Sequence, residues 1–270
     1  MTFSLTLAAF AALLIGGLGT ALYRSRREVL RLRVRSEATA SNLETLQTSF
    51  AHFVPKEVIE RVISSGISTG AERKDVTALF ADLVGFTALS ESMEPALLVR
   101  ILNGYFERMS QAVTEHRGHV STFLGDGVLA LFGALQPNPW QANDAVHAAL
   151  AMLRELERYS QELADQGLPT LAIGVGLHRG TGVAGLVGSR DLLHFACVGR
   201  IVNMAARLQD LTRACDADIL ITEAVRRDLD PRFVLRPMAP AALRGIEQPV
   251  ATHAVEGFEA ERQISESPIP

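Results

Sequence analysis

The feature that most constrains the fold of this chain is the alternation of strand-type and helix-type segments between residues 75 and 221. Runs rich in β-branched and apolar residues predict strands over Asp75–Leu83, His119–Leu124, Val128–Phe132, Leu171–Leu177, Gly182–Val187, His194–Val198 and Ile219–Ile221. Apolar residues at helical spacing predict helices over Pro95–His116, Trp140–Gln166 and Ile201–Leu211. The first elements follow the order β-α-β-β-α-β, which is the split βαβ, or ferredoxin-like, arrangement of the α+β class.

This order also predicts where two carboxylates meet. In the split βαβ arrangement the first strand lies centrally, beside a strand of the hairpin that turns at Gly125-Asp126-Gly127. We therefore expect Asp82 and Asp126 to lie side by side at one edge of the sheet. Like charges at close range repel unless a cation neutralises them, and two hard oxygen ligands suit Mg²⁺ or Mn²⁺. The alternative is that Asp82 caps a helix and Asp126 only forms a turn, and at this point both interpretations stay open.

A turn that follows Asp82 is a second candidate feature. The segment Leu83-Val84-Gly85-Phe86-Thr87 predicts a glycine-containing turn into a helix. Exposed backbone N–H groups at such a turn are suited to bind a phosphate. A pair of aspartates, a metal and a phosphate-binding turn together indicate phosphoryl transfer with two metal ions.

Composition excludes several other classes of protein. The 270 residues are 48% hydrophobic with a net charge of only −4, so the chain as a whole is not disordered. Cys197 and Cys215 are the only cysteines, which excludes a disulfide scaffold. A pI near 6.0 gives no support for nucleic-acid binding. Only two of the 26 basic residues, Lys56 and Lys74, are lysines, so the positive charge for any phosphate chemistry must come from arginine or metal.

The N-terminus predicts a membrane anchor. Phe3 to Tyr23 carry no charge, and 21 helical residues span a hydrocarbon core of about 30 Å. Arg24, Arg26 and Arg27 follow at once, so the positive-inside rule predicts a single-pass protein of the cell inner membrane with its N-terminus outside and its body in the cytoplasm. A cleaved signal peptide is the alternative, but it would begin with basic residues, which Met1 to Ser4 lack.

Residues 24–73 are expected to form a basic juxtamembrane segment and a helical linker, and 257–270 a flexible tail. Leu43, Leu46, Phe50 and Phe53 form a short apolar seam at heptad spacing before Pro55. The seam fits a dimerising stalk and, equally, an amphipathic linker that packs on its own domain.

Three segments resemble the signature segments of the class III nucleotidyl cyclases. They are Phe80-Ala-Asp-Leu-Val-Gly-Phe-Thr87, Phe123-Leu-Gly-Asp-Gly127 and Gly199-Arg-Ile-Val-Asn-Met-Ala-Ala-Arg-Leu208. The resemblance covers residues 74–256 and implies a homodimeric catalytic domain whose active sites lie at the subunit interface. It implies that ATP is converted to 3′,5′-cyclic AMP and pyrophosphate, with two Mg²⁺ or Mn²⁺ ions in each site.

The resemblance also assigns roles to individual residues. Asp82, Asp126 and the backbone carbonyl of Leu83 would bind the metals, and Gly85, Phe86 and Thr87 would bind the phosphates. The other face would supply Asn203 and Arg207, which project from one side of a helix because they are four residues apart. Arg207 would stabilise charge at the α-phosphate, and Asn203 would orient the ribose.

The base-reading positions depart from the family pattern. Family members that use ATP usually carry a lysine where this chain has Thr122, and an aspartate or threonine where it has Ala196. The basic group that binds the terminal phosphates aligns with Arg244. Relaxed base specificity, with GTP or a pyrimidine nucleotide as substrate, is therefore an alternative, as is a nucleotide-binding or dimerisation module that has lost catalysis.

Overall fold

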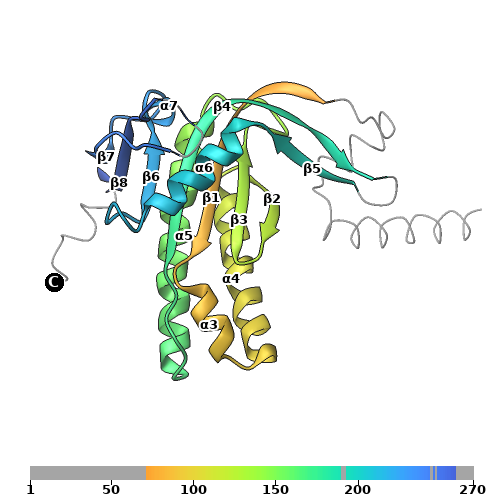
Figure 1. Cartoon of the computed structure of the whole chain (residues 1–270), viewed down its shortest axis with the longest axis vertical. Helices are drawn as coiled ribbons and strands as arrows, with labels where there is room; N and C mark the ends of the chain where they lie inside the picture. The colour runs from red at the N-terminus through yellow and green to blue at the C-terminus, as the bar shows by residue number, and fades with distance from the viewer. Residues whose placement is uncertain (1–70, 190–192, 244–245, 247, 260–270) are drawn as a thin grey trace, which may run out of the picture. The chain divides into compact units, whose positions relative to one another are not determined.

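The computed structural model describes residues 71–189, 193–243, 246 and 248–259 (Figure 1). Eight strands form one sheet in the order β2-β3-β1-β4-β6-β8-β7, with β5 paired to β4. The strands are β1 (Glu72–Leu83), β2 (His119–Leu124), β3 (Gly127–Phe132), β4 (Ile173–Gly188), β5 (Leu193–Val198), β6 (Ile219–Thr222), β7 (Phe233–Pro237) and β8 (Thr252–Phe258). The helices are α3 (Phe86–Ser92), α4 (Pro95–Glu115), α5 (Gln141–Asp165), α6 (Arg200–Leu211) and α7 (Glu223–Arg226).

The predicted split βαβ arrangement is confirmed. Strand β1 lies between β3 and β4 and pairs antiparallel with both, and β3 pairs with β2 through the predicted hairpin. Strands β7 and β8, which the sequence did not predict, extend the sheet beyond β6. Because β8 ends at Phe258, the first two residues of the predicted flexible tail belong to a strand.

The prediction of two strands over Leu171–Leu177 and Gly182–Val187 is wrong, since these segments form one continuous strand, β4. Arg179, Gly180 and Thr181, which were expected to interrupt it, pair with Thr77, Val76 and Asp75. Strand β1 also begins three residues earlier than predicted, at Glu72. A long partner strand thus supplies hydrogen bonds that carry β4 through a glycine-rich stretch of weak strand propensity.

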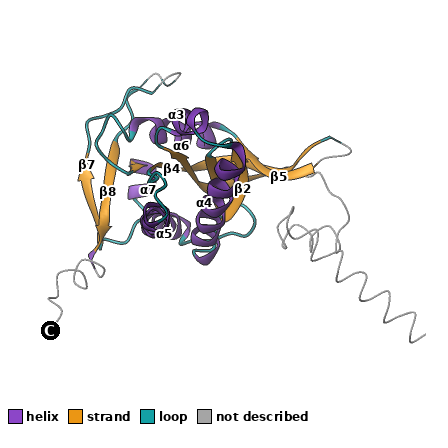
Figure 2. Cartoon of the chain, turned by 90° about the horizontal axis from the view of Figure 1, so that it is seen from below, coloured by secondary structure: helices purple, strands orange, loops and turns teal. Residues whose placement is uncertain are grey.

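Helices cover the sheet on both faces, with α4 and α5 on one side and α6 on the other (Figure 2). The larger core lies under α4 and α5, and it includes Leu79, Tyr105, Met152, Val175 and Leu177. A smaller cluster forms beneath α6 around its buried side chains and those of β6 and β8, namely Met204, Leu208, Leu220 and Ala254. The alternation of β-strand side chains explains the division, because neighbouring residues of one strand face opposite cores.

A row of glycines lets α6 lie unusually close to β4. Gly174, Gly176, Gly180 and Gly182 occupy alternate positions and therefore share the face that α6 covers. A Cβ at Gly176 would lie 2.2 Å from the carbonyl oxygen of Ala205, and one at Gly174 would lie 2.2 Å from Oγ1 of Thr212. Backbone contact at Gly176 thus helps to set the position of α6, and with it the points from which the α6 side chains project.

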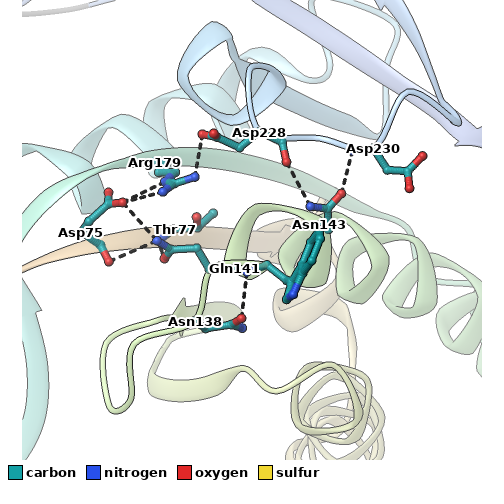
Figure 3. A network of polar contacts seen from close by, with 9 residues as sticks. Asp75, Thr77, Asn138, Gln141, Asn143, Arg179, Asp228 and Asp230 are labelled. Carbon is teal, nitrogen blue, oxygen red and sulfur yellow. Dashed lines mark hydrogen bonds and ion pairs between the residues drawn. The ribbon is translucent and has the colours of Figure 1, made fainter.

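A polar network holds the opposite end of β1 (Figure 3). Arg179 of β4 forms ion pairs of 2.6 Å with both Asp75 and Asp228. The side chain of Gln141 accepts a hydrogen bond of 2.9 Å from the Thr77 backbone N–H, and its amide donates to Asp75. The network therefore joins β1, β4, the start of α5 and the segment after α7 at the end of the sheet remote from Asp82.

The predicted anchor, linker seam and stalk lie outside the described residues. Within the part of the chain that the structure describes, no helix combines the length and apolarity needed to cross a bilayer.

Candidate active site

The structure brings Asp82 and Asp126 together at the end of β1. Ala81 pairs with Val128 of β3, so the next residue, Asp82, reaches the hairpin turn that carries Asp126. Oδ1 of Asp82 lies 3.2 Å from the point where a Cβ would stand at Gly127, so the Asp82 side chain lies directly against the hairpin turn. The predicted meeting of the two aspartates is confirmed.

Asp82 is perturbed by its surroundings. Burial raises the pKa of Asp82 to about 6, and the charge of Asp126 and a hydrogen bond between the two carboxyl groups act in the same direction. Arg213 lowers the pKa of Asp82, and Asp210 raises it. Asp82 does not cap a helix, since the N-cap of α3 is Gly85 and no side chain bonds there. The part of the alternative in which Asp82 caps a helix is therefore wrong.

The donor set fits a hard divalent cation. Among the described residues no group of three or more His, Cys, Asp or Glu side chains forms a complete metal site. Asp82, Asp126 and the carbonyl of Leu83 would supply oxygen ligands only, which leaves positions for phosphate oxygens, the usual arrangement for Mg²⁺. Two mutually repelling carboxylates, one of them half-buried, are also the electrostatic setting that a cation relieves.

The predicted turn after Asp82 is present. Gly85 has a left-handed backbone with φ of 73°, which favours glycine, and α3 begins at Phe86. Val84 donates a backbone hydrogen bond of 2.8 Å to Ala172, which fixes the start of the turn. Thr87 is exposed and Phe86 is half-buried. The first turn of α3 thus faces the same edge as the aspartate pair without a side chain that caps it.

Sequence reasoning missed two residues beside this pair. Arg213, just after α6, donates from Nη2 to the Leu83 carbonyl oxygen at 3.3 Å. Tyr105 of α4 was predicted only as part of an apolar helix face, yet its buried hydroxyl has no hydrogen-bond partner among the described residues. Burial first, and then the charges of Asp82 and Asp126, raise the pKa of Tyr105. The position of Tyr105 among apolar residues of a helix could have indicated a buried hydroxyl near the site. No sequence motif around Arg213 predicts its contact with Leu83.

Asn203 and Arg207 lie on α6, where the sequence predicted them. Asn203 is exposed and Arg207 is half-buried. Arg207 forms no ion pair with Asp82 or Asp126, although all three residues are described, and it is not among the charges that act on Asp82. Within one chain, no ion pair therefore joins Arg207 to either aspartate.

The base-reading positions lie on β2 and β5, which contact each other. Ser121 donates from Oγ to the Phe195 carbonyl at 3.2 Å, beside Ala196, and Oγ1 of Thr122 donates to the Phe123 carbonyl at 3.3 Å. Neither Thr122 nor Ala196 offers a charge to a base. Arg244 lies outside the described residues.

A split βαβ sheet with an aspartate pair at the end of its central strand, and an Asn/Arg pair on α6, has the arrangement expected of a nucleotidyl cyclase domain. The family model for the adenylate and guanylate cyclase catalytic domain matches residues 69–257. The chain belongs to this family.

Relatives of both substrate types resemble the chain. The adenylate cyclase of Anabaena cylindrica is 36% identical over 70% of this chain and 38% of its own length. The guanylyl cyclase Cya2 is 32% identical with a TM-score of 0.64, covering 70% of this chain and 95% of that structure. The adenylyl cyclase CyaB from P. aeruginosa is 30% identical with a TM-score of 0.65, covering 69% and 95%. The chain thus spans less than two fifths of the Anabaena relative.

Proposed function

We propose that this chain is an adenylate cyclase that converts ATP to 3′,5′-cyclic AMP and pyrophosphate. The observation that carries the proposal is the pairing of Asp82 with Asp126 beside the Gly85 turn, in a chain of the cyclase family. The fold alone does not require two carboxylates to lie side by side, where their negative charges repel each other.

The protein residues divide into two groups. Asp82, Asp126 and the Leu83 carbonyl would hold two Mg²⁺ or Mn²⁺ ions, which when bound would activate the ribose 3′-hydroxyl and neutralise the phosphates. The backbone N–H groups of Gly85, Phe86 and Thr87 would bind the triphosphate at the start of α3.

The second group would come from the partner in a homodimer. Arg207 would donate its planar guanidinium to the α-phosphate oxygens as charge develops there. Asn203 would hold the ribose so that its 3′-oxygen is aimed at the phosphorus. Arg207 is not among the charges that act on Asp82 within one chain, which supports a site shared between two subunits. Arg244 is proposed to bind the terminal phosphates.

The choice of base is the least constrained element. The Anabaena relative and CyaB are adenylate cyclases, whereas Cya2 is a guanylyl cyclase. Thr122 and Ala196 can make few hydrogen bonds to either purine, so we propose preference for ATP with side activity on GTP. For signalling at the membrane, we propose that residues 1–23 anchor the chain with the catalytic domain in the cytoplasm.

The test is to incubate the purified full chain with Mn²⁺ and each of ATP, GTP, CTP and UTP, and to identify the products by mass spectrometry. We expect cyclic AMP as the main product and none from Asp82→Ala or Arg207→Ala. Nucleotide binding without any cyclic product, in folded wild-type protein, would favour the non-catalytic module instead.

A further inference from the structure

Arg213 makes a direct contact with an expected metal ligand. Its Nη2 donates to the Leu83 carbonyl oxygen across 130 positions of sequence, at 3.3 Å. It is also the one positive charge among those that act on Asp82. The Arg213 guanidinium therefore contacts an oxygen atom that, in the proposed function, would bind a divalent cation.

The fold delivers Arg213 to this place. Gly174 is the strand partner of Asp82, and Thr212 packs on the open face of that glycine. Thr212 is buried and bonds the Gln209 carbonyl through both its backbone N–H and its hydroxyl, the latter at 2.7 Å. The backbone just before Arg213 is thus fixed over the metal edge, while the Arg213 residue itself is exposed.

We propose that Arg213 is an internal cation that occupies this edge in the metal-free protein and competes with the divalent ion for the Leu83 carbonyl oxygen. A guanidinium has only donors, so it cannot join a metal's ligand shell and must yield the carbonyl when a metal binds there. It neutralises part of the carboxylate charge when the metal is absent and repels the dication when it arrives. The inference rests on the proposed metal site.

If Arg213 competes with the metal, removing its charge should strengthen Mn²⁺ binding and weaken the stability of the metal-free protein. Arg213→Gln keeps a polar side chain but removes the charge, so we expect Mn²⁺ to bind about tenfold more tightly to the full chain. The same variant should melt at a lower temperature than wild type in EDTA, because Asp82 loses a positive charge near it. Arg213→Lys keeps the charge and should bind Mn²⁺ within about twofold of wild type.

The measurement is a titration of Mn²⁺ without nucleotide, in which electron paramagnetic resonance reports the free ion. Arg236→Gln is the matched control, since Arg236 likewise donates to a backbone carbonyl, that of Asp216 at 3.1 Å, away from the site. We expect it to leave Mn²⁺ affinity unchanged. Unchanged or weaker binding by Arg213→Gln would overturn the proposal, as would equally tight binding by Arg213→Gln and Arg213→Lys.

Asp82→Asn separates this inference from the proposed function. Loss of Mn²⁺ binding in Asp82→Asn, with wild-type affinity in Arg213→Gln, would confirm the metal site and refute only the role of Arg213. If Asp82→Asn binds Mn²⁺ as wild type does, the metal site itself is wrong, and the proposal for Arg213 is wrong with it.

Discussion

Gly176 of β4 lies against Ala205 of α6 so closely that a Cβ on Gly176 would stand 2.2 Å from the Ala205 carbonyl oxygen. The contact is between backbones, so a flexible side chain cannot relieve it. The helix that carries Asn203 and Arg207 is therefore positioned by the absence of a side chain on the strand beneath it.

We expect Gly176→Ala to displace α6 and to lower cyclase activity at least about tenfold, since small shifts of reacting groups are costly. Overpacking of this kind also costs about 1–3 kcal/mol of stability, measurable by denaturant unfolding. Gly180→Ala is the control, because its Cβ would meet side-chain atoms and no backbone, namely a methyl of Ile201 at 3.0 Å and Nε2 of His178 at 3.5 Å. Equal effects of the two substitutions would contradict the backbone contact as the cause.

The raised pKa of Asp82 predicts that the metal-free protein becomes less stable towards unfolding as the pH rises. The folded-state pKa of about 6 lies above the ordinary 3.8, so the stabilising proton is fully bound below pH 3.8 and is lost as the pH rises through 6. In EDTA at pH 7, Asp82→Asn should be more stable than wild type by about 1 kcal/mol, a figure reduced for solvent screening of this half-exposed group. Unfolding curves at pH 4 should show this difference vanish, whereas a constant difference across pH would contradict the assignment.

The lowered pKa of His178 predicts that the protein becomes less stable towards unfolding as the pH falls. Burial first, and then the charge of Arg200, lower the pKa of His178 from 6.5 to about 4, and its Nδ1 shares a 2.9 Å hydrogen bond with Thr222. Its contribution is present above pH 6.5 and is lost as the pH falls towards 4, on the order of 2–3 kcal/mol. His178→Asn should flatten this part of the pH–stability profile. The same substitution should leave the profile above pH 7 parallel to that of wild type, which thermal unfolding can check.

Complementation tests the shared site. Asp82→Ala and Arg207→Ala homodimers should each be nearly inactive, while a mixture contains heterodimers with one intact site. With random exchange in a two-site dimer, activity should recover to roughly a quarter of wild type. Pull-down with two different tags would establish that heterodimers form. Heterodimers without activity would argue against sites built from two subunits.

Base selectivity depends on Thr122 and Ala196. Thr122 and Ala196 offer few hydrogen-bonding groups that the wrong base would leave unsatisfied. We therefore expect ATP to be preferred over GTP by only about tenfold in kcat/KM. Thr122→Lys combined with Ala196→Asp should sharpen this preference by supplying a donor and an acceptor. Rejection of GTP by about a thousandfold in wild type would mean that another residue reads the base.

The sequence by itself determined the β-α-β-β-α order of the first elements, because apolar periodicity indicates each of them. It also predicted the meeting of Asp82 with Asp126, because the split βαβ order places the first strand beside the hairpin that turns at Gly125-Asp126-Gly127. The signature segments likewise predicted the cyclase family, and the match of the family model to residues 69–257 confirms it.

Only the tertiary structure decided that β4 is a single strand, that α6 lies in backbone contact with it, and that Arg213 reaches Leu83. Arg179-Gly180-Thr181 has no local preference for a strand and becomes one because β1 pairs along its whole length. Arg213 and Leu83 are 130 positions apart, and their contact follows from the packing of Thr212 on Gly174. Such relationships arise from pairing and packing between distant segments, which the periodicity of any single segment cannot encode.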